Sequence, residues 1–448
     1  MISLLLFIVI ILISLIYLGN KLLNEAAFSP WYYRYFNLWK PKYPIHGQCE
    51  EEYKEVKEVF RNSFERGIEV GASVAVYNKG KLVVELYGGY QDYENKELFN
   101  ETTLTIVFSS SKFMASAVIA KLVDQGLLAY NEKICTYWPE FSNGGKEEVT
   151  LTDLLRHEGG LPYLLDPEPA YEDVYDSKRM KKIIENTTHV YNGKRVRCYH
   201  GITRGLILNE LVKLVDKKGR SIGQLFKEEI NPKYNIEFYL GLEKEYENRK
   251  AKWYNYPTLD ALTLFLPKWL IGRKAVRLNR DTLKRDSNLM KLMKLKLSNE
   301  KDLPNAKDML TIEIPSVNGH TNAKSLAKIG SYFANNGSVN CKTYLSEYTT
   351  TESIGEVVEA YDEAILLKTE MTKGGFGIFK YKELEEYSNV SFYGWGGMGG
   401  SLILFSPEYQ FSFAYVMNAQ HLVLMSEGRA VDLLVTAFKA HVKTLTKN

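Results

Sequence analysis

Ser109 and Lys112 are the two residues of this 448-residue chain whose types and spacing best suit joint chemistry. Positions three apart lie on one face of a helix, so the lysine amine can reach the serine hydroxyl. A hydroxyl is a weak nucleophile until a neighbouring group takes its proton, and a desolvated lysine can do so. The pair therefore predicts a serine nucleophile that is activated by a lysine.

The segments on either side of Ser109 support this prediction. Residues 104–108 form an apolar, β-branched run that predicts a strand leading into the serine. Residues 114–122 follow a helical apolar pattern that ends at Gly126. Ser109 is therefore expected at a turn from strand to helix, where its hydroxyl is exposed to a substrate.

Three other serines carry similar motifs without this setting. Ser298 with Lys301 falls in a polar loop, and Ser325 with Lys328 falls inside a predicted helix. Ser221 lies in a G-x-S-x-G sequence, but that motif requires a preceding strand, and here a helix precedes it. All three are interpreted as structural, with Ser221 as a helix N-cap.

Two more segments carry candidate groups. His157 follows a short predicted helix capped by Thr152. It is either a catalytic base or a histidine that locks a loop by hydrogen bonds, since no carboxylate partner is evident. Residues 394–400 contain five glycines in seven positions. Glycine is unfavourable within strands, so this segment is either a sharp bend or backbone that approaches something closely, such as a ligand carbonyl.

Composition restricts the class of protein. The chain is 45% hydrophobic and 25% charged with a net charge of +3, which is typical of a globular protein and too small to indicate nucleic-acid binding. Its four cysteines are widely spaced and its seven histidines show no ligand spacing. We expect no metal and no cofactor, and one large two-lobed unit.

The amino terminus predicts membrane attachment. Residues 2–18 are almost wholly apolar, a length at the short end for a spanning helix. The alternative is a cleaved signal peptide, but a basic n-region and a small-residue cleavage site are both missing. We therefore expect a single-pass anchor over residues 1–20, a tether over 21–50 and the folded unit over 51–448.

The side of the membrane is open on these residues. Lys21, Arg34, Lys40 and Lys42 follow the apolar segment and favour a cytosolic body. Four glycosylation sequons favour a lumenal body instead. These sequons begin at Asn100, Asn186, Asn336 and Asn389.

Residues 249–296 differ from the rest of the chain. They hold 13 Lys and Arg residues against three acids, together with Trp253, Tyr254 and Trp269. A segment that is basic, aromatic and apolar suits a surface that lies on anionic lipid, or a lid over the active site. An ordinary solvated insertion explains it equally well.

The remaining patterns predict a helix, a hairpin and a sheet-rich end. A helix is expected over residues 51–66, and two β-rich runs at 70–77 and 81–87 flank an Asn/Gly turn. Helices are also expected after Tyr199 and over residues 321–333. Near the end, residues 401–405 and 411–417 predict a second hairpin, followed by a helix over 425–443.

Three separated motifs together resemble those of class C β-lactamase-like serine hydrolases. They are Ser109-x-x-Lys112, Tyr199-His200-Gly201 and Trp395-Gly396-Gly397, in the family's order and approximate spacing. Within that family the chain is most similar to animal β-lactamase-domain proteins and to family VIII carboxylesterases. The resemblance covers residue 51 to the end. It implies an α+β fold: an antiparallel sheet flanked by helices, plus a mostly helical lobe over roughly 130–320.

The resemblance also implies roles. Ser109 would attack a carbonyl and form an acyl-enzyme, and Lys112 would take its proton or depress its pKa. Tyr199 would act as base or relay, its tyrosinate form favoured by Lys112. The backbone N–H groups of Ser109 and Met398 would form the oxyanion hole. Trp395, Gly396, Gly397 and His200 would contact the substrate.

Two departures from the family pattern bear on the substrate. Gly201 stands where true β-lactamases carry an asparagine that contacts amides. Trp395 stands where a lysine or histidine would grip a substrate carboxylate. The expected activity is therefore cleavage of a small acyl ester or amide, with a β-lactamase or peptidase disfavoured. The alternative is a catalytically silent scaffold or binding protein.

Overall fold

The computed structural model describes most of the chain beyond its amino-terminal segment. The described residues are 9–14, 43–65, 69–164, 169, 171–255, 284, 286–292, 294–298, 300, 302–387, 390–420 and 428–445. Of the predicted anchor only residues 9–14 are described, and they are helical. In the described part of the chain, no helix has the length and apolar character needed to cross a bilayer.

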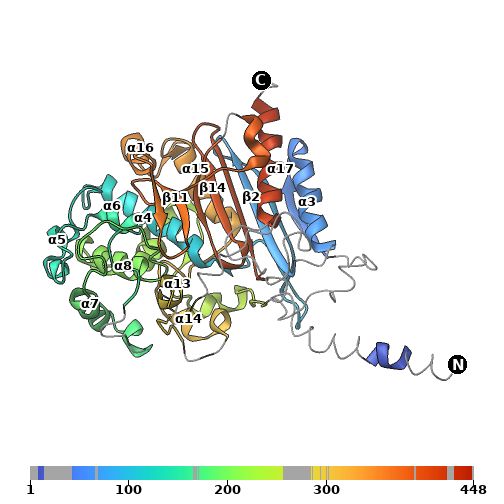
Figure 1. The fold of residues 1–448 in the computed structure, drawn as a ribbon. Coiled ribbons are helices and arrows are strands. Elements are labelled where there is room, and N and C mark those ends of the chain that lie inside the picture. Colours follow the sequence, from blue (N-terminus) through green and yellow to red (C-terminus); the bar gives the residue numbers. More distant parts are fainter. Residues whose placement is uncertain are drawn as a thin grey trace.

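A ten-stranded antiparallel sheet organises the fold (Figure 1). Its strands run in the order β1-β3-β2-β15-β14-β13-β12-β11-β10, and β4 pairs with β3. Their bounds are β1 (Ile45–Cys49), β2 (Gly71–Asn78), β3 (Lys81–Asp92), β4 (Glu97–Leu98), β10 (Val358–Asp362), β11 (Leu367–Met371), β12 (Gly377–Phe379), β13 (Phe392–Gly396), β14 (Leu402–Ser406) and β15 (Phe411–Met417).

The middle of this sheet is buried on both faces. Every residue of β14 and β15 is buried. Successive side chains of a strand point to opposite faces, and β15 shows the consequence. Ser412 donates a hydrogen bond of 2.8 Å to the Ala327 carbonyl in one helix. The neighbouring Phe411 packs against Phe438 in another helix, with ring centroids 5.4 Å apart.

Helices therefore cover both faces. The helix α15 (Ala323–Ala334) packs on β15, β2 and β14, and α17 (Gly428–Leu445) packs on the other face together with α3 (Lys54–Glu65) (Figure 1). The α+β class with an antiparallel sheet flanked by helices is confirmed. The predicted hairpins, the helix after residue 50 and the carboxyl-terminal helix are also present, with small shifts at their ends.

The remaining helices lie beside the sheet and form a second, mostly helical part (Figure 1). They are α4 (Ser111–Asp124), α5 (Ile134–Tyr137), α6 (Leu151–Leu155), α7 (Ser177–Asn186), α8 (Thr203–Val215), α9 (Ile222–Leu225), α10 (Asn231–Tyr234), α13 (Asn288–Leu292), α14 (Asp308–Thr311) and α16 (Glu347–Ile354). A small sheet has the strand order β5 (Thr105–Ile106), β7 (His320–Thr321) and β6 (Phe238–Tyr239). It joins this part to the turn at Phe108–Ser110, called the Ser109 turn below.

The predicted tether over residues 21–50 needs correction, and most of the basic insertion lies outside the described part of the chain. The tether expected over 21–50 overlaps β1, which pairs with β3 from Ile45 to Cys49, so the folded unit begins before residue 51. Pro44 precedes this strand and does not prevent it. Residues 21–42 and 256–283, the latter being most of the basic insertion, lie outside the described residues.

A buried ion pair links the carboxyl-terminal helix to the core. Arg429 at the start of α17 binds Glu69 at 2.8 Å, and both side chains are almost fully buried. Tyr415 also donates to Glu69, and Arg429 donates to the Gly399 carbonyl at 3.0 Å. The pair therefore fixes the glycine-rich turn that follows β13 against the sheet.

Glu69→Gln should lower the free energy of unfolding by about 3 kcal/mol, because removing one partner of a buried ion pair leaves the other charge uncompensated. Chemical denaturation measures this difference. The matched control is Glu51→Gln, which breaks an exposed pair with Lys54 and should leave the free energy of unfolding nearly unchanged. Equal effects of the two variants would contradict a structural role for the buried pair.

Candidate active site

Ser109 lies in a tight turn between β5 and α4. The strand expected over 104–108 is shorter than predicted, and a 3-10 turn, Phe108–Ser110, leads directly into the helix. Phe108 has a φ of 45°, a left-handed conformation that is uncommon for a bulky residue and has an energetic cost. The ring of Trp253 packs against the Phe108 ring, with centroids 4.9 Å apart, and supports this conformation. The strained turn leaves Ser109 half-buried rather than buried.

The structure brings the three predicted catalytic residues together. Ser109 Oγ lies 2.7 Å from Tyr199 Oη and 3.2 Å from Lys112 Nζ. Tyr199 is 90 residues away along the chain and reaches Ser109 from the segment that precedes α8. Two potential proton-transfer groups thus lie within hydrogen-bond distance of one hydroxyl, as nucleophilic catalysis requires.

Two backbone carbonyls hold the Lys112 amine in place. Lys112 is 1% exposed, and its Nζ donates to Gly201 O at 2.7 Å and to Ser316 O at 2.9 Å. A neutral amine has two N–H donors and one lone pair, so these carbonyls leave its lone pair for Ser109. After proton transfer, the ammonium has three N–H donors, one each for Gly201 O, Ser316 O and Ser109 Oγ. One geometry therefore suits both protonation states.

Burial favours the neutral form of this amine. Loss of solvent lowers the pKa of Lys112 well below its ordinary value, and the nearby Arg204 cation lowers it further. A lysine with a depressed pKa is a base that can accept the Ser109 proton near neutral pH.

Tyr199 differs from the expectation that its tyrosinate is favoured. Loss of solvent raises the pKa of Tyr199 to about 12, although the hydrogen bond with Ser109 and the charge of Arg204 partly oppose this. The expectation assumed that Lys112 is a cation, but its burial disfavours the charged form. Tyr199 is therefore a phenol at neutral pH, suited to relaying a proton rather than to holding negative charge.

The glycine-rich segment after β13 packs directly on the Ser109 turn. A Cβ atom on Gly397 would lie 2.2 Å from Val107 O and 3.2 Å from Ser110 N. Ser401 and Ser110 tie the two segments together: Ser401 Oγ donates to Val107 O at 2.8 Å, and Ser110 Oγ lies 3.1 Å from Ser401 Oγ. The glycine at 397 is thus explained by close approach of backbone to backbone.

This packing places Met398 beside the Ser109 turn. In the described part of the chain, no residue accepts a hydrogen bond from the backbone N–H of Ser109 or Met398. Both residues are half-buried. Two backbone N–H groups without a partner beside the candidate nucleophile Ser109 are the kind of donors that an oxyanion hole needs.

Gly397→Ala should reduce kcat for ester hydrolysis by about 100-fold, because its methyl group would push the Met398 backbone away from Ser109. Assays with a p-nitrophenyl ester measure this. The control is Gly126→Ala, where an added Cβ meets nothing within 4 Å but the φ of 70° is unfavourable for alanine, so it reports the effect of a destabilising glycine replacement that touches no other group. A Gly397→Ala enzyme with normal kcat would exclude this backbone from transition-state stabilisation.

Two histidines near the site bind backbone groups of the loops around it. His200 is fully buried, and its Nε2 accepts from Leu161 N at 3.0 Å while its Nδ1 lies 2.6 Å from Cys198 O. Both ring nitrogens are occupied, so the expected contact between His200 and a substrate is not supported. His157 Nδ1 accepts from His200 N at 2.9 Å. This bond fits the loop-locking interpretation of His157, whose buried Nε2 has no hydrogen-bond partner among the described residues.

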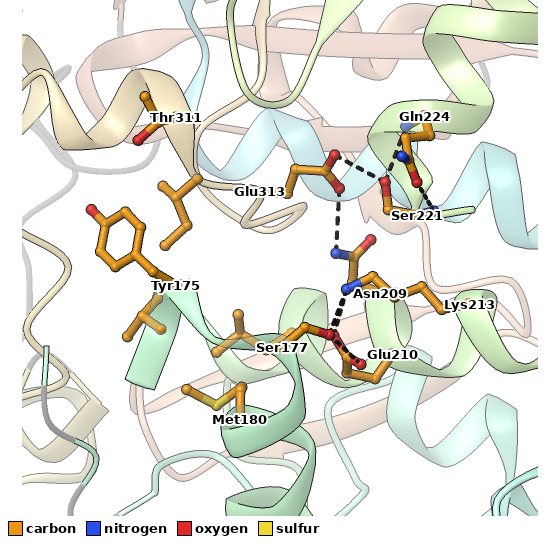
Figure 2. Close-up of a pocket in the computed structure, with 13 residues that line it drawn as sticks. Tyr175, Ser177, Met180, Asn209, Glu210, Lys213, Ser221, Gln224, Thr311 and Glu313 are labelled. Atoms are coloured by element: carbon orange, nitrogen blue, oxygen red, sulfur yellow. Dashed lines mark hydrogen bonds and ion pairs between the residues drawn. The ribbon is translucent and has the colours of Figure 1, made fainter. Parts of the chain in front are cut away.

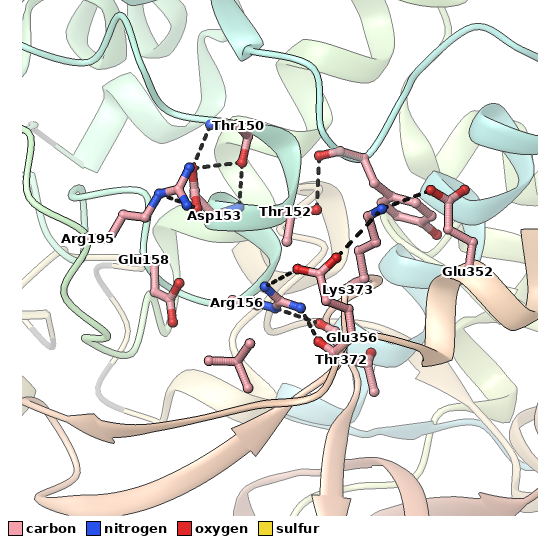
Figure 3. Close-up of polar contacts among 12 residues, drawn as sticks. Thr150, Thr152, Asp153, Arg156, Glu158, Arg195, Glu352, Glu356, Thr372 and Lys373 are labelled. Atoms are coloured by element: carbon pink, nitrogen blue, oxygen red, sulfur yellow. Dashed lines mark hydrogen bonds and ion pairs between the residues drawn. The ribbon is translucent and has the colours of Figure 1, made fainter.

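Arg156 fastens the His157 loop to the sheet (Figure 3). Its Nε donates to the Thr372 carbonyl at 3.2 Å and its Nη1 binds Glu356 at 3.2 Å. The preceding helix α6 begins with a capping box between Thr150 and Asp153, so Thr150 is the N-cap and the prediction of Thr152 was wrong. Thr152 instead donates to the Tyr130 carbonyl at 2.9 Å.

Trp395 lies within a cluster of aromatic rings on the other side of Tyr199. It stacks on Tyr199 with an interplanar angle of 16° and a centroid distance of 6.4 Å, and it lies 5.5 Å from His157. Gly396 is the last residue of the same strand and is half-buried. Trp395 is half-buried as well, so the wall beside Ser109 is aromatic where true β-lactamases carry a cation.

Sequence reasoning missed three residues that surround the predicted catalytic groups. Asp362 accepts from the backbone N–H of Tyr199 at 3.1 Å and so fixes the tyrosine. Ser316 supplies a carbonyl to Lys112, and Arg204 lies buried behind the site. Asp362 and Ser316 are far away in the chain from the groups that they contact, and Arg204 lies five residues after Tyr199 but 92 after Lys112.

The other serine candidates have structural roles. Ser221 caps α9 and donates to Glu313 at 2.9 Å in a polar pocket of about 290 Å³ that also contains Asn209 and Glu210 (Figure 2). Ser298 donates to Asp308, and Ser325 accepts from the Glu237 N–H. The elbow-like motif at Ser221 therefore serves as a helix cap.

Within the described residues, no cluster of three or more His, Cys, Asp or Glu side chains is arranged to hold a metal ion. The four cysteines are free thiols.

Known proteins share this fold and these motifs. A family model described as Beta-lactamase matches residues 56–437. The esterase/β-lactamase LipL of Mycobacterium tuberculosis is 25% identical over 386 residues, which are 84% of this chain and 83% of LipL. A family VIII carboxylesterase superposes with a TM-score of 0.76 and 26% identity, over 89% of this chain and 100% of that one. A penicillin-binding protein homologue from Caulobacter crescentus superposes with a TM-score of 0.73 and 27% identity, over 89% of this chain and 100% of that one.

The family model spans far more than half of the chain, and the solved structures reproduce its fold over nearly all of it. The resemblance that the three motifs indicated is confirmed. The chain belongs to the β-lactamase family of serine hydrolases.

Proposed function

We propose that this protein cleaves small, neutral acyl esters through an acyl-enzyme on Ser109. The observation that carries the proposal is the position of Ser109 Oγ, 2.7 Å from Tyr199 Oη and 3.2 Å from the buried Lys112 Nζ. A hydroxyl with a buried amine and a phenol at this range is equipped for acyl transfer. Relatives named as an esterase and a carboxylesterase agree with this assignment.

In the proposed acylation, the Ser109 proton moves to Lys112 as Oγ bonds to the substrate carbonyl carbon. The carbonyl electron pair becomes an oxyanion, which the N–H groups of Ser109 and Met398 stabilise. The ester C–O bond then breaks. Tyr199 gives its proton to the leaving alkoxide and regains one from the Lys112 ammonium. A water molecule reverses these steps on the acyl-enzyme and releases the acid.

Two features favour a neutral ester over a penicillin or a peptide. Trp395 offers an aromatic face instead of a cation, so a substrate carboxylate has no partner there. At position 201, a Cβ atom would lie 2.9 Å from the Leu292 side chain and 3.2 Å from the Tyr199 ring. A side chain at position 201 would thus require the Leu292 methyl group and the Tyr199 ring to shift, and glycine leaves the site without the asparagine that contacts amides in true β-lactamases.

Labelling with a fluorophosphonate probe tests the proposal, with Ser109→Ala as the matched control. We expect labelling of the native chain and none of the variant. Hydrolysis of short-chain p-nitrophenyl esters should exceed hydrolysis of a chromogenic cephalosporin by a wide margin. Failure of the native chain to react with either probe would favour a scaffold protein, and faster cephalosporin hydrolysis would favour a β-lactamase.

We also propose that residues 1–20 attach the enzyme to a membrane, as the apolar composition of residues 2–18 indicates. Alkaline carbonate extraction of cells that express the full chain tests this. The native protein should stay in the pellet, and a variant without residues 1–20 should be extracted. Extraction of both would remove the anchor from the proposal.

A further inference from the structure

Arg204 is a fully buried cation without a counter-charge. It lies in the first turn of α8, and its side chain has no exposed surface. In the described part of the chain no carboxylate pairs with it, and its Nε and Nη1 atoms have no hydrogen-bond partner. Burying an unpaired charge is strongly unfavourable. Such a residue is unexpected unless its charge serves a purpose.

The contacts of the guanidinium place it beside the catalytic groups. Its Nη2 donates to Ser116 Oγ, and Ser116 follows Lys112 by one turn on the same face of α4. Its Cζ lies 5.6 Å from the centre of the Trp395 ring, the ring that stacks on Tyr199. Gly375 leaves space for the group, because a Cβ atom there would lie 2.9 Å from Nη2.

Other charged or titratable groups around the site are neutral or already compensated. His157 and His200 are buried, and burial lowers the pKa of each imidazole, so both are neutral near pH 7. Asp362 accepts three backbone N–H groups, those of Tyr199, Ala364 and Ile365.

Arg197 is paired with Glu158 at 2.7 Å. Cys198 is a buried thiol whose pKa is raised to about 12 by loss of solvent, so it is uncharged. Among the described groups that face Lys112, Arg204 therefore remains as a fixed charge with no partner.

We propose that Arg204 is a positioning residue that acts on the catalytic pair electrostatically. Its fixed positive charge keeps Lys112 in the neutral, proton-accepting form and stabilises negative charge that develops on Tyr199 during proton relay. This inference rests on the proposed function and assigns it a further residue. Arg204 is buried behind Trp395. Its charge therefore acts on Lys112 and Tyr199, and the side of the site that faces the substrate stays uncharged.

The direction of each pKa agrees with this role. After burial, Arg204 is the other cause that lowers the pKa of Lys112. The same charge opposes the burial that raises the pKa of Tyr199. A cation disfavours a second cation nearby and favours an anion, so one charge explains both effects.

Arg204→Met tests the proposal through the pH profile of kcat/KM with a p-nitrophenyl ester. The acid limb reports protonation of the free enzyme's base. Without the neighbouring charge, Lys112 should protonate at higher pH, so the limb should move upward by at least about one pH unit. At a pH below both limbs, the variant should then be at least about tenfold slower than the native enzyme.

Arg204→Lys keeps the charge and should retain the native acid limb within about half a pH unit. A melting experiment gives a second reading. Arg204→Met removes an uncompensated buried charge, so its melting temperature should equal or exceed the native value. An unmoved acid limb, or a lower melting temperature with equal slowing at every pH, would overturn the proposal and leave Arg204 a packing residue.

A measurement without turnover separates this inference from the proposed function. In protein labelled with ¹³C at the lysine ε-carbons, the Lys112 resonance is assigned by its loss in Lys112→Met. Its titration should move to higher pH in Arg204→Met. If the titration of Lys112 does not move in Arg204→Met, the role of Arg204 is overturned whether or not esters are cleaved. If it moves in a protein that cleaves no ester, only the proposed function is overturned.

Discussion

Lys112→Met should slow acylation of Ser109 by about 1,000-fold, because general-base catalysis typically contributes a factor of this size. Methionine fills nearly the same volume and places no polar atom between the Gly201 and Ser316 carbonyls. Stopped-flow kinetics with a p-nitrophenyl ester measures the acylation rate. The residual rate should also lose the native acid limb, since the base that protonates there is gone.

Lys328→Met is the matched control for this variant. Lys328 belongs to the pair with Ser325 on α15, and its Nζ donates only weakly to Asn235 O at 3.4 Å. Its replacement should leave the acylation rate within a factor of two. A Lys112→Met enzyme that keeps both its rate and its acid limb would show that another group takes the proton from Ser109.

Tyr199→Phe should lower kcat by between about 100- and 10,000-fold while leaving the fold intact. The change removes the hydroxyl that lies 2.7 Å from Ser109 Oγ, but the ring that stacks on Trp395 remains. If Tyr199 protonates the leaving group, the loss should be greatest for esters with poor leaving groups. A comparison of alkyl with p-nitrophenyl esters tests this dependence.

Tyr163→Phe is the matched control, because Tyr163 is a half-buried tyrosine that packs, like Tyr199, on the small hydrophobic cluster of Cys198, Leu292 and Ala364 but makes no hydrogen bond to Ser109. It should behave like the native enzyme. A Tyr199→Phe enzyme at nearly native rate on alkyl esters would remove the phenol from the mechanism, and Lys112 would then serve as both base and acid.

The candidate nucleophile, Ser109, could be singled out from sequence because its setting is local. The short strand, the turn and the helix α4 all leave patterns in consecutive residues, and three motifs in order added the distant partners. The same reasoning misjudged the ionisation of Tyr199. Ionisation depends on how deeply Lys112 is buried, and no local pattern encodes burial at a junction of several elements.

Asp362, Ser316 and Arg204 were not predictable for a related reason. Asp362 comes from β10, and Ser316 acts through its backbone carbonyl, which any residue type could supply. Arg204 follows an ordinary helix pattern, and only its surroundings show that it has no partner. Their roles arise from tertiary packing, which one sequence does not display.

The pairing of β2 with β15 has a consequence for how the enzyme forms. The two strands are neighbours from Phe411 opposite Asn78 to Met417 opposite Ala72, although more than 300 residues separate them. Pairings between such distant segments make folding slow. The centre of the sheet therefore cannot close until the last strand has been synthesised. The sheet on which the site is built is thus completed late, so full hydrolytic activity should arise only after synthesis is almost complete.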